Sequence, residues 1–238
     1  GKDDGSISTI IDGNKYSAYN YLYDIQFEQA QERTITSGTT TSTESYVWGD
    51  ASANDGKLKL LYATTAGTGT YKEFTVPDAV DSWVSNSSVT YDSDAWYIRN
   101  TADGKAAWGV AKLSYSQREL FYVDAAASAG EGSVAAFKLK DGYNNISTWN
   151  DSTYSTDYQW GAADSNNSKP REFFVMKKDG TGREFVLDSI STSSPGYIAQ
   201  VSSDGSTAWG MGQSVDGSAI LFMLRADGSK QEFVLPGD

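Results

Sequence analysis

Residues 173–187 read FFVMKKDGTGREFVL, and residues 221–235 read LFMLRADGSKQEFVL. Seven of the fifteen aligned positions are identical, and the Asp-Gly pairs that begin at Asp179 and Asp227 superpose. Each stretch consists of an apolar run, a turn-forming dipeptide and a second apolar run, which is the pattern of a β-hairpin. The chain therefore contains a duplicated hairpin. Looser copies lie at residues 58–76 and 118–139.

A Trp-Gly pair precedes each of these hairpins. The four tryptophans are Trp48, Trp108, Trp160 and Trp209, which are 60, 52 and 49 residues apart. Asp-Gly occurs nine times along the chain, and both of its residues suit the positive φ angles of a two-residue hairpin turn. This spacing predicts four-stranded antiparallel units that repeat about every 50 residues.

The expected fold is all-β. Repeated four-stranded units favour a four- or five-bladed β-propeller, and the alternative is a β-sandwich of duplicated hairpins. We expect a single domain over residues 1–238, because no segment has the composition of a linker. The repeats are expected at residues 1–45 (a degenerate copy), 46–90, 91–142, 143–190 and 191–238. Residues 20–36 of the degenerate copy fit either a hairpin or a short helix.

Charge and residue types exclude several functions. Lys and Arg number 19 against 31 Asp and Glu, which gives a net charge of −12. A nucleic-acid-binding protein needs a basic face, so nucleic acid is not an expected partner. His and Cys are both absent, which excludes Ser-His-Asp and Cys-His catalysis and the usual zinc sites. No apolar run approaches the ~18 residues of a membrane span.

The Trp-Gly tryptophans occupy equivalent positions inside expected strands. We predict that all four are repeat-core packing residues, and the alternative is a ring of aromatic platforms for sugar rings. A second repeated position carries a glutamate, at Glu73, Glu184 and Glu232. A glycosidase uses one pair of carboxylates, whereas these recur in each unit. We therefore expect solvent-facing glutamates paired with Lys72, Arg183 or Lys230, and no enzymatic activity.

Three further tryptophans, Trp83, Trp96 and Trp149, are out of register with the repeat. Aromatic faces beside amides and carboxylates are typical of a sugar-binding surface, because C–H faces stack on the rings while polar atoms bind the hydroxyls. The segment around Trp149 has this composition. The predicted ligand-binding residues are Trp149, Asn150, Asp151, Tyr154, Tyr158, Trp83 and Trp96.

Metal binding has little support. Asp92 with Asp94, and Asn54 with Asp55, are partial candidates for Ca²⁺, which takes six to eight oxygen ligands. The spacing of a calcium-binding loop does not occur, so we interpret these residues as turn residues and predict no cofactor.

The succession of Trp-Gly, the strand AILFML at residues 219–224, an Asp-Gly turn and the final QEFV at residues 231–234 resembles the blades of tryptophan-rich β-propeller lectins. The resemblance covers residues 46–238. It implies a propeller and, by analogy, sugar binding. The arginine with which those lectins contact sugar has no consistent counterpart, since Arg118 and Arg171 begin that strand in two repeats and Ala219 stands there in the last.

Two functions lead from the sequence, and the third is a glycosidase or lyase that works with carboxylates alone, for which Glu73, Glu184 and Glu232 are the candidates. The first is a secreted or surface-exposed, lectin-like module that binds a glycan or polysaccharide through loop aromatics. The second is a self-assembling extracellular structural protein, such as a filament, sheath or virion subunit, in which strand edges pair between copies. An acidic, Cys-free chain rich in Ser, Thr and Gly suits both of these functions, which lie outside the cell or at its surface.

Overall fold

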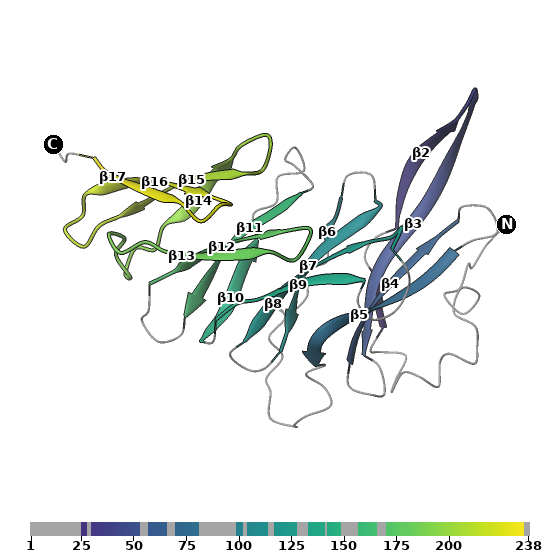
Figure 1. Ribbon diagram of the computed structural model, residues 1–238, viewed down its shortest axis with the longest axis horizontal. Helices are drawn as coiled ribbons and strands as arrows, with labels where there is room; N and C mark the ends of the chain where they lie inside the picture. Colours follow the sequence, from purple (N-terminus) through teal and green to yellow (C-terminus); the bar gives the residue numbers. More distant parts are fainter. Residues whose placement is uncertain are drawn as a thin grey trace. The chain divides into compact units, whose positions relative to one another are not determined.

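The structure, a computed structural model, describes the chain in eleven segments. These are residues 25–27, 30–52, 57–65, 70–80, 99–101, 104–113, 117–127, 133–140, 142–148, 157–165 and 170–235. Within them the regular structure consists of strands β1 to β17, arranged in four sheets (Figure 1). The predicted all-β class is confirmed.

The first sheet is built around one long strand. β3 (Thr40–Ser52) pairs along its first half with β2 (Gln31–Ser37) and along its second half with β1 (Ile25–Phe27). β4 (Lys57–Thr64) and β5 (Thr70–Val80) complete the order β1-β3-β4-β5. Of the two readings of residues 20–36, the strand is therefore correct for residues 31–37, which form a hairpin with the start of β3.

The other three sheets each contain four strands in sequence order. The second sheet contains β6 (Arg99–Asn100), β7 (Ala106–Lys112), β8 (Arg118–Asp124) and β9 (Val134–Lys138). The third contains β10 (Tyr143–Thr148), β11 (Tyr158–Ser165), β12 (Glu172–Lys177) and β13 (Gly182–Val186). The fourth contains β14 (Tyr197–Val201), β15 (Thr207–Gln213), β16 (Ala219–Arg225) and β17 (Lys230–Val234).

The Asp-Gly hairpins differ in one respect from the two-residue turn that the sequence predicts. The N–H of Gly180 donates to the carbonyl of Lys177, and that of Gly228 donates to Arg225, so each glycine is the fourth residue of its turn. Both glycines have positive φ, at 87° and 100°. The side chain of Asp179 accepts the N–H of Thr181, two residues further on. Aspartate is therefore the third residue of the turn, and glycine is its left-handed fourth residue.

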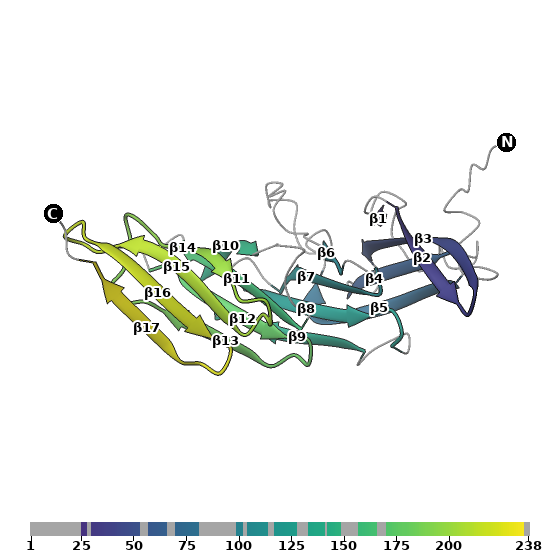
Figure 2. The same cartoon turned by 90° about the horizontal axis from the view of Figure 1, so that it is seen from above.

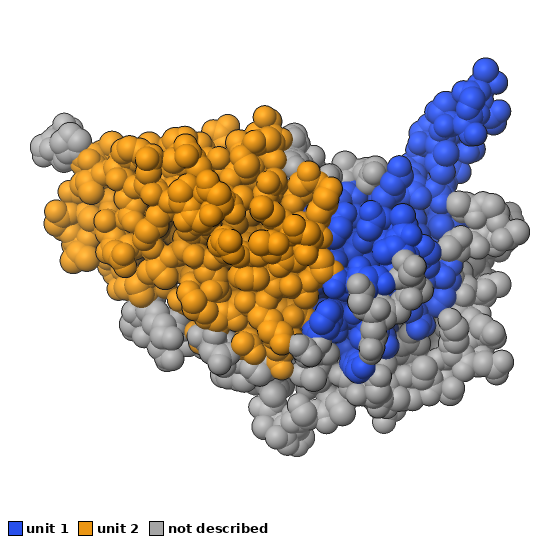
Figure 3. All heavy atoms as spheres, in the orientation of Figure 1, with its two compact units in different colours: residues 1–112, 121–134 blue, residues 113–120, 135–238 orange. Residues whose placement is uncertain are grey.

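The chain divides into two compact units (Figure 3). Unit 1 comprises residues 1–112 and 121–134, and unit 2 comprises residues 113–120 and 135–238. In unit 1, the largest fully buried side chains of the first sheet include Trp48 and Phe74. In unit 2, the sheets β10–β13 and β14–β17 lie side by side (Figure 2) and share one apolar core. One face of each of these two sheets is thereby covered.

Candidate functional site

Three of the four Trp-Gly tryptophans are buried. Trp48 is 0% exposed, Trp160 is 2% exposed and Trp108 is 6% exposed, whereas Trp209 is 37% exposed. Trp48 and Trp160 also stack on an aromatic ring of the last strand of their own sheet. The ring centroids of Trp48 and Phe74, and those of Trp160 and Phe185, are both 6.0 Å apart.

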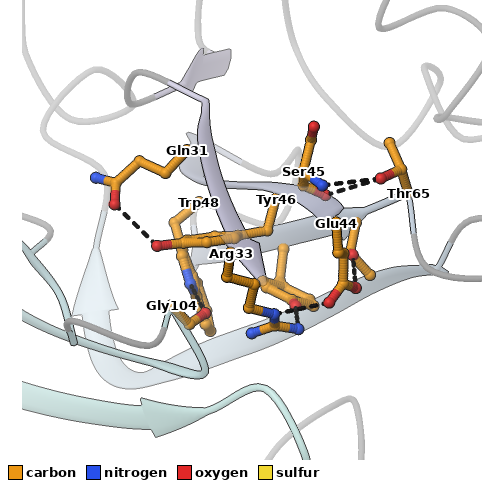
Figure 4. Close-up of polar contacts among 10 residues, drawn as sticks. Gln31, Arg33, Glu44, Ser45, Tyr46, Trp48, Thr65 and Gly104 are labelled. Carbon is orange, nitrogen blue, oxygen red and sulfur yellow. Dashed lines mark hydrogen bonds and ion pairs between the residues drawn. The ribbon is translucent and has the colours of Figure 1, made fainter. Parts of the chain in front are cut away.

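Two of the buried indoles make the same hydrogen bond. Nε1 of Trp48 donates to the carbonyl of Gly104 at 3.2 Å (Figure 4), and Nε1 of Trp160 donates to the carbonyl of Gly205 at 2.7 Å. Both acceptors belong to an Asp-Gly turn between the first two strands of the following sheet. A buried indole N–H needs an acceptor, and this turn carbonyl provides it. The Trp-Gly motif is thus a sheet-to-sheet contact that the fold uses twice within described residues.

The glycine of the motif has a separate role on the opposite face. At Gly109, Gly161 and Gly210 an added Cβ would overlap the ring of a phenylalanine on the neighbouring strand. The three phenylalanines are Phe121, Phe174 and Phe222. In each case the ring atom Cζ lies 2.1 to 2.3 Å from the position of the added Cβ, so a side chain at the glycine position is excluded by close packing.

The register of the last two sheets makes Trp160 and Trp209 structural equivalents. Trp160 on β11 lies opposite Val175 on β12, and Trp209 on β15 lies opposite Met223 on β16. The neighbouring row reads Ala162, Phe173 and Phe185 in the third sheet. The corresponding row in the fourth sheet reads Met211, Leu221 and Phe233.

We define the terminal face as the two central rows of side chains on the Trp209 side of β14–β17, which are flanked by the pairs Thr207–Arg225 and Gln213–Ala219. Directly opposed residues in antiparallel strands lie on the same face, so its members are Tyr197, Gln200, Trp209, Met211, Leu221, Met223, Gln231 and Phe233. Tyr197 is 52% exposed, Met211 44% and Phe233 43%. Exposed neighbours of this size form an apolar patch, and such patches mark interaction sites.

The repeated glutamates bind backbone. Oε1 of Glu184 accepts the N–H of Lys140 at 2.7 Å, and Oε2 of Glu232 accepts the N–H of Ser189 at 3.3 Å. Both donors precede the first strand of the sheet to which the glutamate belongs. The glutamate therefore ties the incoming segment to the last strand of its sheet. In the first sheet, Glu73 accepts the hydroxyl of Tyr71 at 2.5 Å.

The expected partners of these glutamates are found in part. Nζ of Lys230 lies 3.7 Å from Glu232, as the sequence predicts. Glu184 pairs instead with Lys140, whose Nζ lies 3.3 Å away. Lys140 also donates to Glu172 at 3.0 Å, and Glu172 is only 2% exposed. This hydrogen bond to Glu172 raises the pKa of Lys140.

A second buried carboxylate lies in the first sheet (Figure 4). Glu44 is 3% exposed and accepts Nε of Arg33 at 2.7 Å and the hydroxyl of Thr64. Arg33 also donates to the Tyr62 hydroxyl at 3.2 Å and lies over the ring of Tyr46. Opposed charges on β2 and β3 thus fix the hairpin onto the sheet.

Arg118, which begins β8, and Arg171, which directly precedes β12, make hydrogen bonds within the fold. Arg171 makes a bidentate pair with Asp164, at 2.7 and 2.8 Å, and donates to the carbonyl of Gly196 at 2.8 Å. Arg118 is 7% exposed and donates to the carbonyl of Gln117.

The predicted ligand-binding residues fall mostly beyond the described segments. Trp83, Trp96, Trp149, Asn150, Asp151 and Tyr154 all lie outside the described residues. Tyr158 is the first residue of β11, is half-buried and packs against the core of unit 2. The calcium candidates at residues 54–55 and 92–94 also lie outside. Among described residues, no group of three or more acidic side chains is placed to hold a metal ion.

The terminal face was not predicted from the sequence. Tyr197, Met211 and Phe233 are ordinary apolar residues of alternating strands, and the same pattern in the third sheet belongs to the core. Met211 and Phe233 align with the core residues Ala162 and Phe185 of the preceding repeat. This alignment marks the face only when the structure shows that these side chains of the last sheet are exposed.

The sequence matches no protein-family model and no curated protein. Among solved structures, the chain is similar to the BP39L lectin from Burkholderia pseudomallei, with 10% sequence identity and a TM-score of 0.38. The match covers 78% of this chain and 50% of the lectin chain, so this chain spans about half the length of that lectin. In the part of the chain that the structure describes, no helix is long and apolar enough to cross a membrane.

Proposed function

We propose that this chain is a non-enzymatic repeat module that binds carbohydrate outside the cell or at its surface. The supporting observation is the length of one connection. Nine residues separate β10 from β11, whereas five separate β6 from β7 and five separate β14 from β15. Insertions in one repeat are where repeat proteins often place a binding site.

The composition of this insertion suits sugars. Trp149 and Tyr154 supply aromatic faces, and Asn150 and Asp151 supply polar atoms for hydroxyl groups. The insertion is followed by Tyr158, which packs on the core of unit 2. Residues 81–98, which contain Trp83 and Trp96, form a second long connection between β5 and β6.

The roles of four described glutamates favour binding over catalysis. A glycosidase needs two carboxyl groups that flank the scissile bond. Glu184 and Glu232 instead accept backbone N–H groups, and Glu44 and Glu172 are buried against cations. The propeller belongs to this proposal as well, and the packing of β10–β13 on β14–β17 supports stacked blades.

The experiment is a glycan array, followed by calorimetry of any ligand found. We expect Trp149→Ala to abolish binding and Tyr197→Ala, which removes an exposed aromatic of β14, to leave it unchanged. Absence of binding to every glycan and polysaccharide would overturn the proposal. Loss of binding in Tyr197→Ala with full binding in Trp149→Ala would overturn the assignment to the insertion.

Self-association is a second candidate function, which the terminal face supports. The sequence suggests pairing of strand edges between copies. The exposed side chains of β14–β17 favour contact through the face of a sheet instead.

A further inference from the structure

The terminal face repeats a surface that is covered elsewhere in the chain. Trp160 and Phe185 belong to the face of β10–β13 that packs against β14–β17, and both are at most 4% exposed. Their equivalents Trp209 and Phe233 are 37% and 43% exposed. A tryptophan and a phenylalanine at the same register positions are therefore core in one sheet and surface in the next, whereas Met223, the equivalent of Val175, is only 4% exposed. A face built like a core face indicates a partner.

The charge of the terminal face identifies a suitable partner. The whole chain carries a net charge of −12, so two copies repel each other over most of their surfaces. None of the eight residues of the terminal face is charged, and the charged residue in the flanking rows is the exposed Arg225. Glu232 lies on the opposite side of the sheet, where it pairs with Phe222. Two terminal faces can therefore meet without burying a carboxylate.

On the second copy, the surface that can meet a terminal face is again the terminal face. In the third and fourth sheets, contact joins the Trp-bearing face of one sheet to the Gly-bearing face of the next. The Gly-bearing face of the first sheet contains Ala51, Leu61 and Ala63, which are all at most 4% exposed. That face is already buried within one copy, so it is not open to Trp209 of another.

We infer that the terminal face binds the terminal face of a second copy of this chain across a two-fold axis. This inference rests on the second candidate function and names its partner. Each interface is self-complementary, as two-fold symmetry requires. Gln200 and Gln231 lie in the same row as Trp209, and an amide oxygen there can accept the indole N–H that a turn carbonyl accepts at Trp160.

The size of the face limits the area that a dimer can bury. Four strands about 4.8 Å apart and about six residues long cover roughly 20 by 20 Å. This is smaller than the roughly 800 Å² per partner of a standard interface. We therefore expect a dissociation constant in the micromolar range or above, which makes the equilibrium measurable.

Sedimentation equilibrium of the full chain from about 1 μM to about 1 mM tests the inference. The variants are Tyr197→Lys and Met211→Lys on the terminal face, with Val215→Lys as control. Val215 is 88% exposed and lies in the turn between β15 and β16. All three substitutions add the same charge at exposed positions, so the fold is retained, and thermal unfolding verifies this.

We expect a monomer–dimer equilibrium whose dissociation constant rises at least about tenfold in each terminal-face variant, because every substitution occurs twice in the interface. The control should match the unmodified chain. A chain that stays monomeric throughout would overturn the inference, as would dimers that persist unchanged in Met211→Lys. Glycan binding is scored separately with Trp149→Ala, so failure of one proposal is distinguishable from failure of the other.

Discussion

The indole Nε1 of Trp160 lies 2.7 Å from the carbonyl oxygen of Gly205, two residues that are 45 positions apart in the chain. This bond joins the second strand of one sheet to the first turn of the next. The bond between Trp48 and Gly104 has the same place in unit 1. A motif that is purely local in sequence is thus a connection between successive sheets.

Replacing Trp160 with Phe should destabilise the chain by about 1–3 kcal/mol, because it leaves a buried carbonyl without its donor and a small cavity beside Phe185. Trp209→Phe is the matched control, because Trp209 is 37% exposed, and its cost should stay within about 0.5 kcal/mol. Urea unfolding of dilute protein measures both. Equal losses in the two variants would contradict the role assigned to Trp160.

Adding a methyl group at Gly109 should destabilise the chain by about 1–3 kcal/mol, since the new Cβ overlaps the ring of Phe121. A smaller side chain opposite should relieve the overlap. We therefore expect Gly109→Ala with Phe121→Leu to be less destabilised than the sum of the two single changes. If the changes in unfolding free energy were strictly additive, the ring of Phe121 would not be the reason that glycine is needed at position 109.

Lys140→Met should destabilise the chain by about 1–3 kcal/mol, because Glu172 is buried and loses a charged donor. Lys178→Met is the comparison: Lys178 pairs with Asp157, and both side chains are at least 50% exposed. Exposed pairs contribute little, so this change should stay within about 0.5 kcal/mol. Thermal unfolding of both variants checks the difference, and a reversed order would contradict it.

The turn that precedes β15 should respond to acid. The side chain of Ser202, followed by the backbone and side chain of Ser206, lowers the pKa of Asp204 from 3.8 to about 2. A pKa below the ordinary value means that the ionised carboxylate favours the native state. Its contribution is present above pH 3.8 and is lost as the pH falls toward about 2.

Asp204→Asn should therefore flatten the dependence of stability on pH over that window. An NMR titration of the Asp204 carboxyl measures the native pKa directly. Asp188→Asn, which makes the same charge change at a side chain that is 89% exposed, is the comparison variant. A native Asp204 pKa at the ordinary value would refute the prediction.

The candidate site was predictable only in part. Composition pointed to Trp149 and its neighbours, and of those residues the structure describes Tyr158, at the start of β11. The terminal face escaped prediction, because Phe233 has the same residue type and the same register position as the core residue Phe185. The roles of Glu184 and Glu232 were also hidden, because their donors lie more than 40 residues away in sequence.

The sequence by itself determined the features that depend on neighbouring residues. Alternating apolar residues and Asp-Gly turns predict hairpins, and the recurring Trp-Gly pair predicts repeated sheets, because strand pairing and turn chemistry act over a few residues. Tertiary structure alone decided what each face meets. Trp160 and Trp209 share the Trp-Gly pair and the same register, yet one is 2% exposed and the other 37%. Burial depends on the sheet that packs opposite, which no local pattern encodes.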